Sequence, residues 1–412
     1  MSSKRFTPAV SLFLPLENPI FGFLAAFSIY LLLSMLGGSP FRVRESAYFN
    51  YLADAFLHGQ YYLRLVPSET VHDLSFFKGH YYLYWPPMPA IVLMPFVAVF
   101  GVDFSDVFFN LILASLNVAM LAVLLRSIDR NRLIRIDAEY RGMLVCFFAF
   151  GTAHVTIAFV GQVWYTAQLL GIFLVASAYL AAIELKGLRA FIVTGVLMGC
   201  AMLTRNHLLF TGIWPAYHLI SKHWDERRRL IPYIIAALLP VFVMGLCFLS
   251  YNYTRFGDIA ELGIRYHKMA PVFVMDYQKY GAFNLHYLPT NFYYQYIHYP
   301  FPFDDDSFKG SSLFLLSPVF FYAFRGIYRG SRDPNILGMV ASILVTSIPI
   351  LLLMGTGWVQ YGPRYTLDFT VPLLLLTACG VQGTSTKVLF WLIVISILHY
   401  IPGIFLYIRL GL

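Results

Sequence analysis

The feature that most constrains this chain is a series of long apolar runs separated by short basic or aromatic connections. A helix needs about 20 apolar residues to cross the hydrocarbon core of a bilayer. Eleven runs approach that length, near residues 19–37, 105–125, 143–160, 164–184, 190–204, 207–220, 231–250, 311–324, 336–355, 367–380 and 388–407. The sequence therefore predicts an all-α polytopic membrane protein with about 11 transmembrane helices, in a single integral membrane domain over residues 1–412.

The composition agrees with a membrane protein. Hydrophobic residues make up 59% of the chain and charged residues 12%, with a mean hydropathy of +0.67, whereas soluble domains are about 45–50% apolar and about 25% charged. In a soluble chain the net charge of +8 would indicate nucleic-acid binding. Here the basic residues lie in the short loops between apolar runs, so we expect membrane lipids and no nucleic acid as partners.

The basic loops predict how the chain is oriented. The stretch 87–101 has three prolines and is short for a span, so we expect it to lie in or dip into the membrane interface. If it is not counted as a span, five loops fall on the side of the N-terminal segment: 126–142, 185–189, 221–230, 325–334 and 382–387. Together with that segment they hold 17 of the 29 lysines and arginines, which the positive-inside rule places in the cytoplasm.

Two long segments, 38–104 and 251–310, then lie on the outer side. Both are dense in tyrosine, phenylalanine, histidine and proline, and neither is of low complexity. Aromatic rings beside polar groups suit a surface that stacks on a sugar ring, although single aromatic residues near a bilayer are more often interfacial anchors. We expect these segments to be structured, to contain juxtamembrane helices and to form the active-site face, in a bacterial inner membrane with that face toward the periplasm.

The stretch RESAYFNYLADAFLHGQ at 44–60 places ionisable residues directly beside the first long apolar run. Its spacing predicts a helix on which Glu45 and Asp54, nine residues apart, point in opposite directions. Carboxylates held near a bilayer are disproportionately functional. The structural alternatives are that Glu45 favours a helix N-terminus through the dipole and that Asp54 belongs to a solvated polar face.

An ordered pattern of segments resembles the GT-C glycosyltransferases, in their protein O-mannosyltransferase and aminoarabinose-transferase-like branch (family 39-like). RESAYFNYLADAFLHGQYY and GHYYLYWPPMPAIVLMPFVAVFG follow the first span, GVLMGCAMLTRNHLLF lies at 195–210, and GWVQYGPRYTLDFTVPLLLL lies at 357–376. The resemblance implies an inverting transfer of a sugar from a polyprenyl-phosphate donor to an acceptor hydroxyl on the outer side. It also implies a carboxylate base in the first outer loop. Where relatives often have two acids, this chain has Arg44-Glu45, so the assignment falls on Glu45, with Asp54 and Asp73 as alternatives.

Such a reaction also needs positive groups that stabilise the departing phosphate. Arginines on the outer side serve no positive-inside purpose, which makes them candidates for this role, although long basic side chains also snorkel to lipid headgroups. The predicted substrate- and phosphate-binding residues are Arg205, His207, Arg265, His267, Arg364 and Tyr365. Asp368, four residues after Arg364, could pair with that arginine at helical spacing.

No metal-binding residues are assigned, and a divalent cation is left open as a cofactor. The triplet Asp304–Asp306 offers carboxylates, but consecutive residues rarely converge on one ion, so we expect a solvated loop. The acceptor, whether glycan, lipid or protein, stays undefined. Two other functions compete with the transferase: a transporter or flippase of lipid-linked sugars, and a polymerase or ligase of surface polysaccharide.

Overall fold

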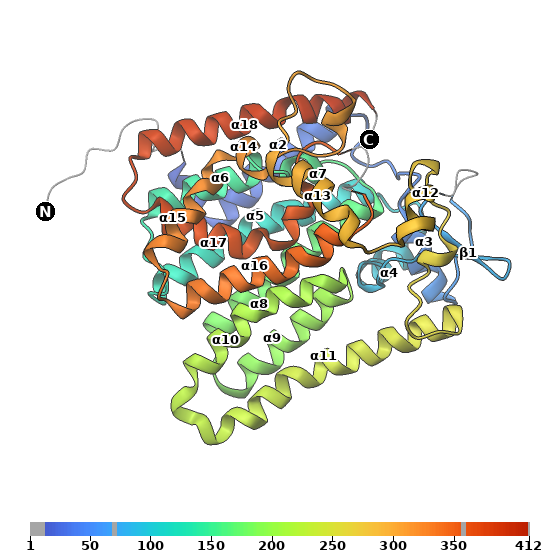
Figure 1. Ribbon diagram of the computed structural model, residues 1–412, viewed down its shortest axis with the longest axis horizontal. Coiled ribbons are helices and arrows are strands. Elements are labelled where there is room, and N and C mark those ends of the chain that lie inside the picture. The colour runs from blue at the N-terminus through green and yellow to red at the C-terminus, as the bar shows by residue number, and fades with distance from the viewer. Residues whose placement is uncertain (1–12, 68–71, 356–359, 411–412) are drawn as a thin grey trace, which may run out of the picture.

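The computed structural model describes residues 13–67, 72–355 and 360–410 (Figure 1). Within these ranges, six helices are long and apolar enough to cross a membrane. They are α2 (Pro19–Leu36), α5 (Asp106–Arg130), α8 (Val163–Glu184), α11 (Arg227–Phe256), α16 (Pro334–Leu352) and α18 (Thr386–Arg409). The predicted class, an all-α polytopic membrane protein, is confirmed.

The other five predicted runs form shorter or interrupted helices. They correspond to α6 (Ala138–Phe150) with α7 (His154–Ala158), to α9 (Gly187–Met202), to 3-10 helix η2 (Asn206–Gly212) with α10 (Ile213–Lys222), to α14 (Leu313–Leu316), η8 (Pro318–Phe320) and α15 (Phe321–Arg329), and to η9 (Arg364–Phe369) with α17 (Thr370–Val381). Four of the five are therefore divided by a turn or a 3-10 segment. Most of the main core lies where α5, α6, α8 and α17 pack together.

The two long segments predicted to be structured do contain short elements. These are α3 (Tyr48–Leu57), strands β1 (Ser75–Phe77) and β2 (His80–Tyr82), α4 (Met88–Phe100), η4 (Ile264–Tyr266), α12 (Pro271–Tyr280), η5 (Leu285–Tyr287), α13 (Leu288–Phe292), the π-helical turn η6 (Tyr293–Ile297) and η7 (Asp305–Phe308); η1 (Leu14–Glu17) and η3 (Trp224–Glu226) lie elsewhere. The strands form an antiparallel hairpin with Ser75 opposite Tyr82.

Most residues of a second, smaller hydrophobic cluster come from the segment 38–104. Phe49 and Leu52 of α3 pack with Leu93 and Val97 of α4, and Leu83 from the connection between them is fully buried in the same cluster. The apolar face of α3 is therefore buried against α4 and against Val163 and Ala167 of α8, which joins the segment to the helix bundle.

The connecting segments gather at two ends of the helix bundle. At one, the basic end, Glu17 pairs with Arg126 and Arg141, and Tyr140 donates to the carbonyl of Thr384. The basic end consists of residues 13–18 and the loops 126–142, 185–189, 221–230, 325–334 and 382–387. The loop end consists of segments 38–104 and 251–310 with the described parts of 353–366, and α3, α4, α12 and β1 lie together there (Figure 1). The predicted grouping of the loops into two sets thus appears in the structure.

Helix α11 is the long helix that runs along one edge of the molecule (Figure 1). Its middle packs on α9 at two glycines of α9. A Cβ atom on Gly195 would collide with the carbonyl oxygen of Ala237, and one on Gly199 would lie 2.5 Å from Sδ of Met244. Glycine at these positions lets the two helix backbones approach closely.

Candidate functional site

Glu45 lies in a turn before α3, not on the helix that the spacing predicted, so the expected opposition of Glu45 and Asp54 on one straight helix is wrong. The helix starts three residues later because the chain is tied to α8: the carbonyl of Ser46 accepts from the backbone N–H of Val163. The side chain of Glu45 is exposed. Among the described residues it forms no ion pair.

Asp54 lies on the buried side of α3 and not on a solvated face. Its two carboxylate oxygens accept from Nε and Nη2 of Arg64, both at 3.0 Å, and Nδ1 of His58 lies 3.5 Å from Oδ1. Both carboxylate oxygens are thus engaged in holding Arg64 against the end of the helix. These contacts indicate a structural role for Asp54.

Asp73 marks the place where the two long segments meet. His267 Nε2 lies 3.1 Å from Asp73 Oδ1, the Asp73 N–H donates to the carbonyl of Lys268, and the Lys268 N–H donates to the carbonyl of Leu74. Asp73 has a φ of +63°, in the left-handed region that aspartate tolerates better than most residues. These contacts hold a carboxylate that is about one quarter exposed beside an imidazole.

Arg205 and His207 share one buried carboxylate. Nε and Nη2 of Arg205 lie 3.1 and 2.9 Å from Oδ2 of Asp368, and Nε2 of His207 lies 2.7 Å from the same oxygen. The guanidinium also contacts the rings of Trp85 and Tyr365, at 5.7 and 5.5 Å from their centroids. Its orientation is therefore fixed by an ion pair in its plane and by aromatic rings around it.

Arg364 is buried next to Arg205 but is held by different groups. Its Nε donates to Oε1 of Gln360, and its guanidinium lies 5.6 Å from the ring of Tyr165 and 4.9 Å from that of Tyr365. The pairing of Arg364 with Asp368 that the spacing allowed does not form, because residues 364–369 are a 3-10 helix. With three residues per turn, side chains four positions apart point about 120° from one another.

Three N–H donors in this region are buried and have no hydrogen-bond partner among the described residues: Nη1 of Arg205, Nη1 of Arg364 and Nε1 of Trp85. Both arginine side chains are about 95% buried. A buried donor without an acceptor costs about 1–3 kcal/mol, and more when it carries charge. Buried donors in native structures bond a protein group, ordered water or a ligand, so these three donors are available to a bound group.

Tyr84 lies near Asp73 and near both arginines, and Tyr48 lies near the acids. Burial, followed by the nearby Asp73 and Tyr365, raises the pKa of Tyr84 well above its ordinary value, against the opposing effect of Arg205 and Arg364. The Tyr84 hydroxyl therefore stays protonated. Burial and then Asp73 and Glu45 likewise raise the pKa of Tyr48. We refer to Glu45, Tyr48, Asp73, Tyr84, Trp85, Arg205, His207, His267, Arg364, Tyr365 and Asp368 as the loop-end cluster.

Of the predicted phosphate-binding residues, Arg265 lies apart from this cluster. Its side chain is 73% exposed, and its one described ion pair, to Glu261, has a separation of 3.8 Å. The triplet at 304–306 is occupied locally: Asp304 caps Ser307, and Asp306 pairs with Lys309 at 2.8 Å. Within the described ranges no three histidine, cysteine, aspartate or glutamate side chains form a metal-binding group.

Sequence reasoning missed Tyr84 and Trp85 as site residues. Both lie in the quoted segment GHYYLYWPP, where they are indistinguishable from interfacial aromatic anchors. The signal that was available is their place next to Pro86-Pro87. The two prolines end the extended chain after β2, and the backbone N–H of the following Met88 donates to the carbonyl of Leu203, two residues before Arg205.

No protein-family model matches the sequence, and neither does a curated protein. Among solved structures, the chain is similar to the crystal structure of ArnT from Cupriavidus metallidurans bound to undecaprenyl phosphate. The TM-score is 0.49 at 12% sequence identity, and the match covers 88% of this chain and 60% of that chain. This chain is therefore matched to less than two thirds of the length of that ArnT chain.

Proposed function

We propose that the protein is a membrane glycosyltransferase of the GT-C type that takes a sugar from a polyprenyl-phosphate donor and transfers it to an acceptor hydroxyl at the loop end. The observation that carries the proposal is that one region holds three buried N–H donors, on Arg205, Arg364 and Trp85, without a hydrogen-bond partner among the described residues. The Arg205 guanidinium lies beside the ring of Trp85, and both guanidinium groups lie beside the ring of Tyr365. A phosphate at this position would accept from them, and both guanidinium charges would favour it.

The proposed reaction is a single displacement with inversion at the anomeric carbon. The acceptor oxygen bonds to that carbon while the bond from the carbon to the phosphate oxygen breaks, and a carboxylate removes the hydroxyl proton. Arg205 and Arg364 stabilise the polyprenyl phosphate as it departs with additional negative charge. The protonated Tyr84 hydroxyl is a further donor for the phosphate or the sugar.

Glu45 is the proposed base. It is exposed and forms no ion pair among the described residues, whereas Asp54 is engaged by Arg64 and Asp73 by His267. It is also the residue on which the family resemblance falls. Asp73 and His267, which both lie near Tyr84, are proposed to orient the acceptor.

The test is the release of free polyprenyl phosphate from a panel of polyprenyl-phosphate sugars, in membranes that carry the full-length protein and an acceptor extract. We expect release with at least one donor, and a loss of about 10²–10⁴-fold in Glu45→Gln, the usual contribution of a general base. Asp276→Asn, an exposed acid on α12, is the control and retains full activity.

Each other outcome has a defined meaning. A loss of this size in Asp73→Asn, together with full activity in Glu45→Gln, would move the base to Asp73. The absence of release with every donor would contradict the transferase and favour a transporter of lipid-linked sugars.

A further inference from the structure

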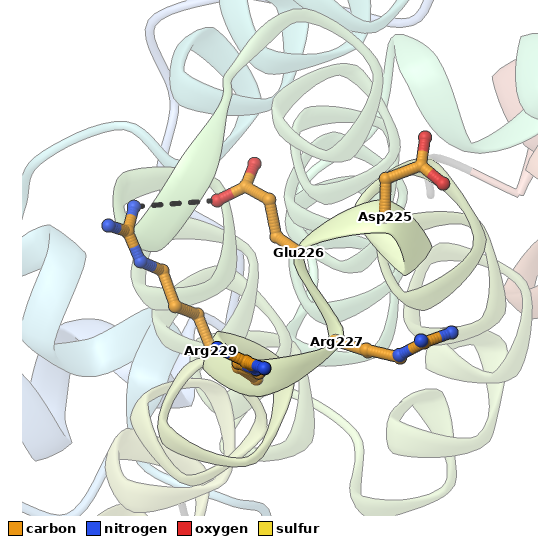
Figure 2. Close-up of a pocket in the computed structure, with 5 residues that line it drawn as sticks. Asp225, Glu226, Arg227 and Arg229 are labelled. Atoms are coloured by element: carbon orange, nitrogen blue, oxygen red, sulfur yellow. Dashed lines mark ion pairs between the residues drawn. The ribbon is translucent and has the colours of Figure 1, made fainter.

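A second site lies at the basic end, at the corner between α10 and α11. Figure 2 shows a surface pocket there, lined by five consecutive residues, Asp225–Arg229. The corner is held to the start of α9, because the backbone N–H of Gly187 donates to Nε2 of His223. It therefore lies at the opposite end of the bundle from the loop-end cluster.

The pocket contains two carboxylates, of Asp225 and Glu226, and the three arginines Arg227–Arg229, so its charges are only partly balanced. Glu226 points toward Arg229, and its Oε2 lies 3.8 Å from Nη1 of that arginine, while Arg227 points away from both (Figure 2). Arg227 and Arg228 are exposed and form no ion pair with a carboxylate in the described part of the chain. The exposed Lys186 and Arg189 add positive charge in the adjoining loop at 185–189. A ligand at this corner would meet an excess of guanidinium and ammonium groups.

An apolar stripe begins one turn from the arginines. Ile231, Ile235, Leu238 and Phe242 follow each other at helical spacing along α11 and are 58–69% exposed. The residues that contact α9, such as Ala237, lie on another face, so the stripe is uncovered. Trp224, on the preceding turn, is 59% exposed, and tryptophan prefers the level of the lipid headgroups.

We propose that this corner binds an anionic phospholipid. Arg227 and Arg228 contact the headgroup phosphate, Trp224 lies at the level of the glycerol backbone, and the acyl chains follow the stripe from Ile231 to Phe242. The negative charge of the headgroup is complementary to the arginines that lack a carboxylate partner. The acyl chains of the same lipid can cover the exposed apolar stripe. This inference is independent of the function proposed for the loop end.

The test measures binding of the first phosphatidylglycerol molecule to the full-length protein in a neutral detergent, by native mass spectrometry, with phosphatidylcholine as the comparison lipid. An arginine near an anionic headgroup contributes roughly fivefold in affinity. Arg227→Gln/Arg228→Gln is therefore expected to weaken phosphatidylglycerol binding by about 25-fold, with a much smaller change for phosphatidylcholine.

The control is Arg132→Gln/Arg135→Gln, which removes the same charge from two exposed arginines of another basic-end loop. It is expected to leave the first phosphatidylglycerol affinity unchanged. Equal affinity of the wild-type protein for the two lipids would overturn the proposal. So would an equal loss in both double variants, which would show attraction to the net charge of the basic end without a site at this corner.

Discussion

Oδ2 of Asp368 is approached by Nε and Nη2 of Arg205 and by Nε2 of His207. The Asp368 side chain is 1% exposed and that of Arg205 is 5% exposed, so neither charge has access to enough water to stand alone. When one partner of such a buried pair is removed, the other is left as an uncompensated charge. At the scale of residues, Asp368 is thus expected to determine whether Arg205 stays in place.

We predict that Asp368→Asn lowers the free energy of unfolding by about 3–5 kcal/mol, the usual effect of breaking a buried pair from one side. The measurement is denaturant-induced unfolding of the purified protein in detergent. Arg205→Gln/Asp368→Asn, which removes both charges, is expected to be less destabilised than the sum of its single variants. A single variant as stable as Asp276→Asn would contradict this reading of the pair.

At this scale the sequence predicted which residues lie together better than it predicted their partners. Arg205, His207, Arg364 and Tyr365 are indeed gathered in one region, but the partner of Asp368 is Arg205, 163 positions away in the chain. A periodicity argument can only pair residues within one helix. It assumed α-helical spacing over 364–368, where the backbone is a 3-10 helix.

At the scale of elements, α9 and α11 depend on a close backbone contact. We predict that Gly195→Ala destabilises the protein by about 1–3 kcal/mol, the typical cost of overpacking, because its Cβ has no room beside the Ala237 carbonyl. The matched control is Gly245→Ala on α11, whose Cβ would lie 4.0 Å from the nearest side-chain atom, of Met202. Both variants gain the same helix propensity, so the difference in their thermal stability in detergent measures the cost of the close contact between the helices. Equal stability of the two variants would contradict it.

Helices occupy all eleven predicted apolar runs, but the apolar pattern did not locate the interruptions within them. Hydropathy responds to composition, which continues smoothly through 311–324, although three short elements, α14, η8 and α15, occupy that run and the start of the loop after it. The interruptions are set by tertiary contacts. An example is Ser317, whose hydroxyl donates to the carbonyl of Gly151 on a distant segment. Such contacts leave no periodic signal.

At the scale of the whole molecule, the separation of basic and aromatic loops predicts which end of the bundle faces the outside of the membrane. This orientation can be measured. In a chain without its native cysteines, we predict that Asp276→Cys on α12 reacts with a membrane-impermeant maleimide in intact spheroplasts. Arg135→Cys, at the basic end, should react only after permeabilisation. Both positions are exposed, so a difference reports the membrane barrier. The reverse pattern would place the loop-end cluster in the cytoplasm.

The meeting of Asp73 with His267, and of Arg205 with Asp368, also sets an order of assembly during synthesis. A nascent chain that has emerged only as far as α10 contains Glu45, Asp73 and Arg205, but neither His267 nor Asp368. The carboxylate at 73 then lacks its imidazole, and the guanidinium at 205 lacks its counter-charge. The cluster is therefore completed only after residue 368, which follows α16, has been synthesised.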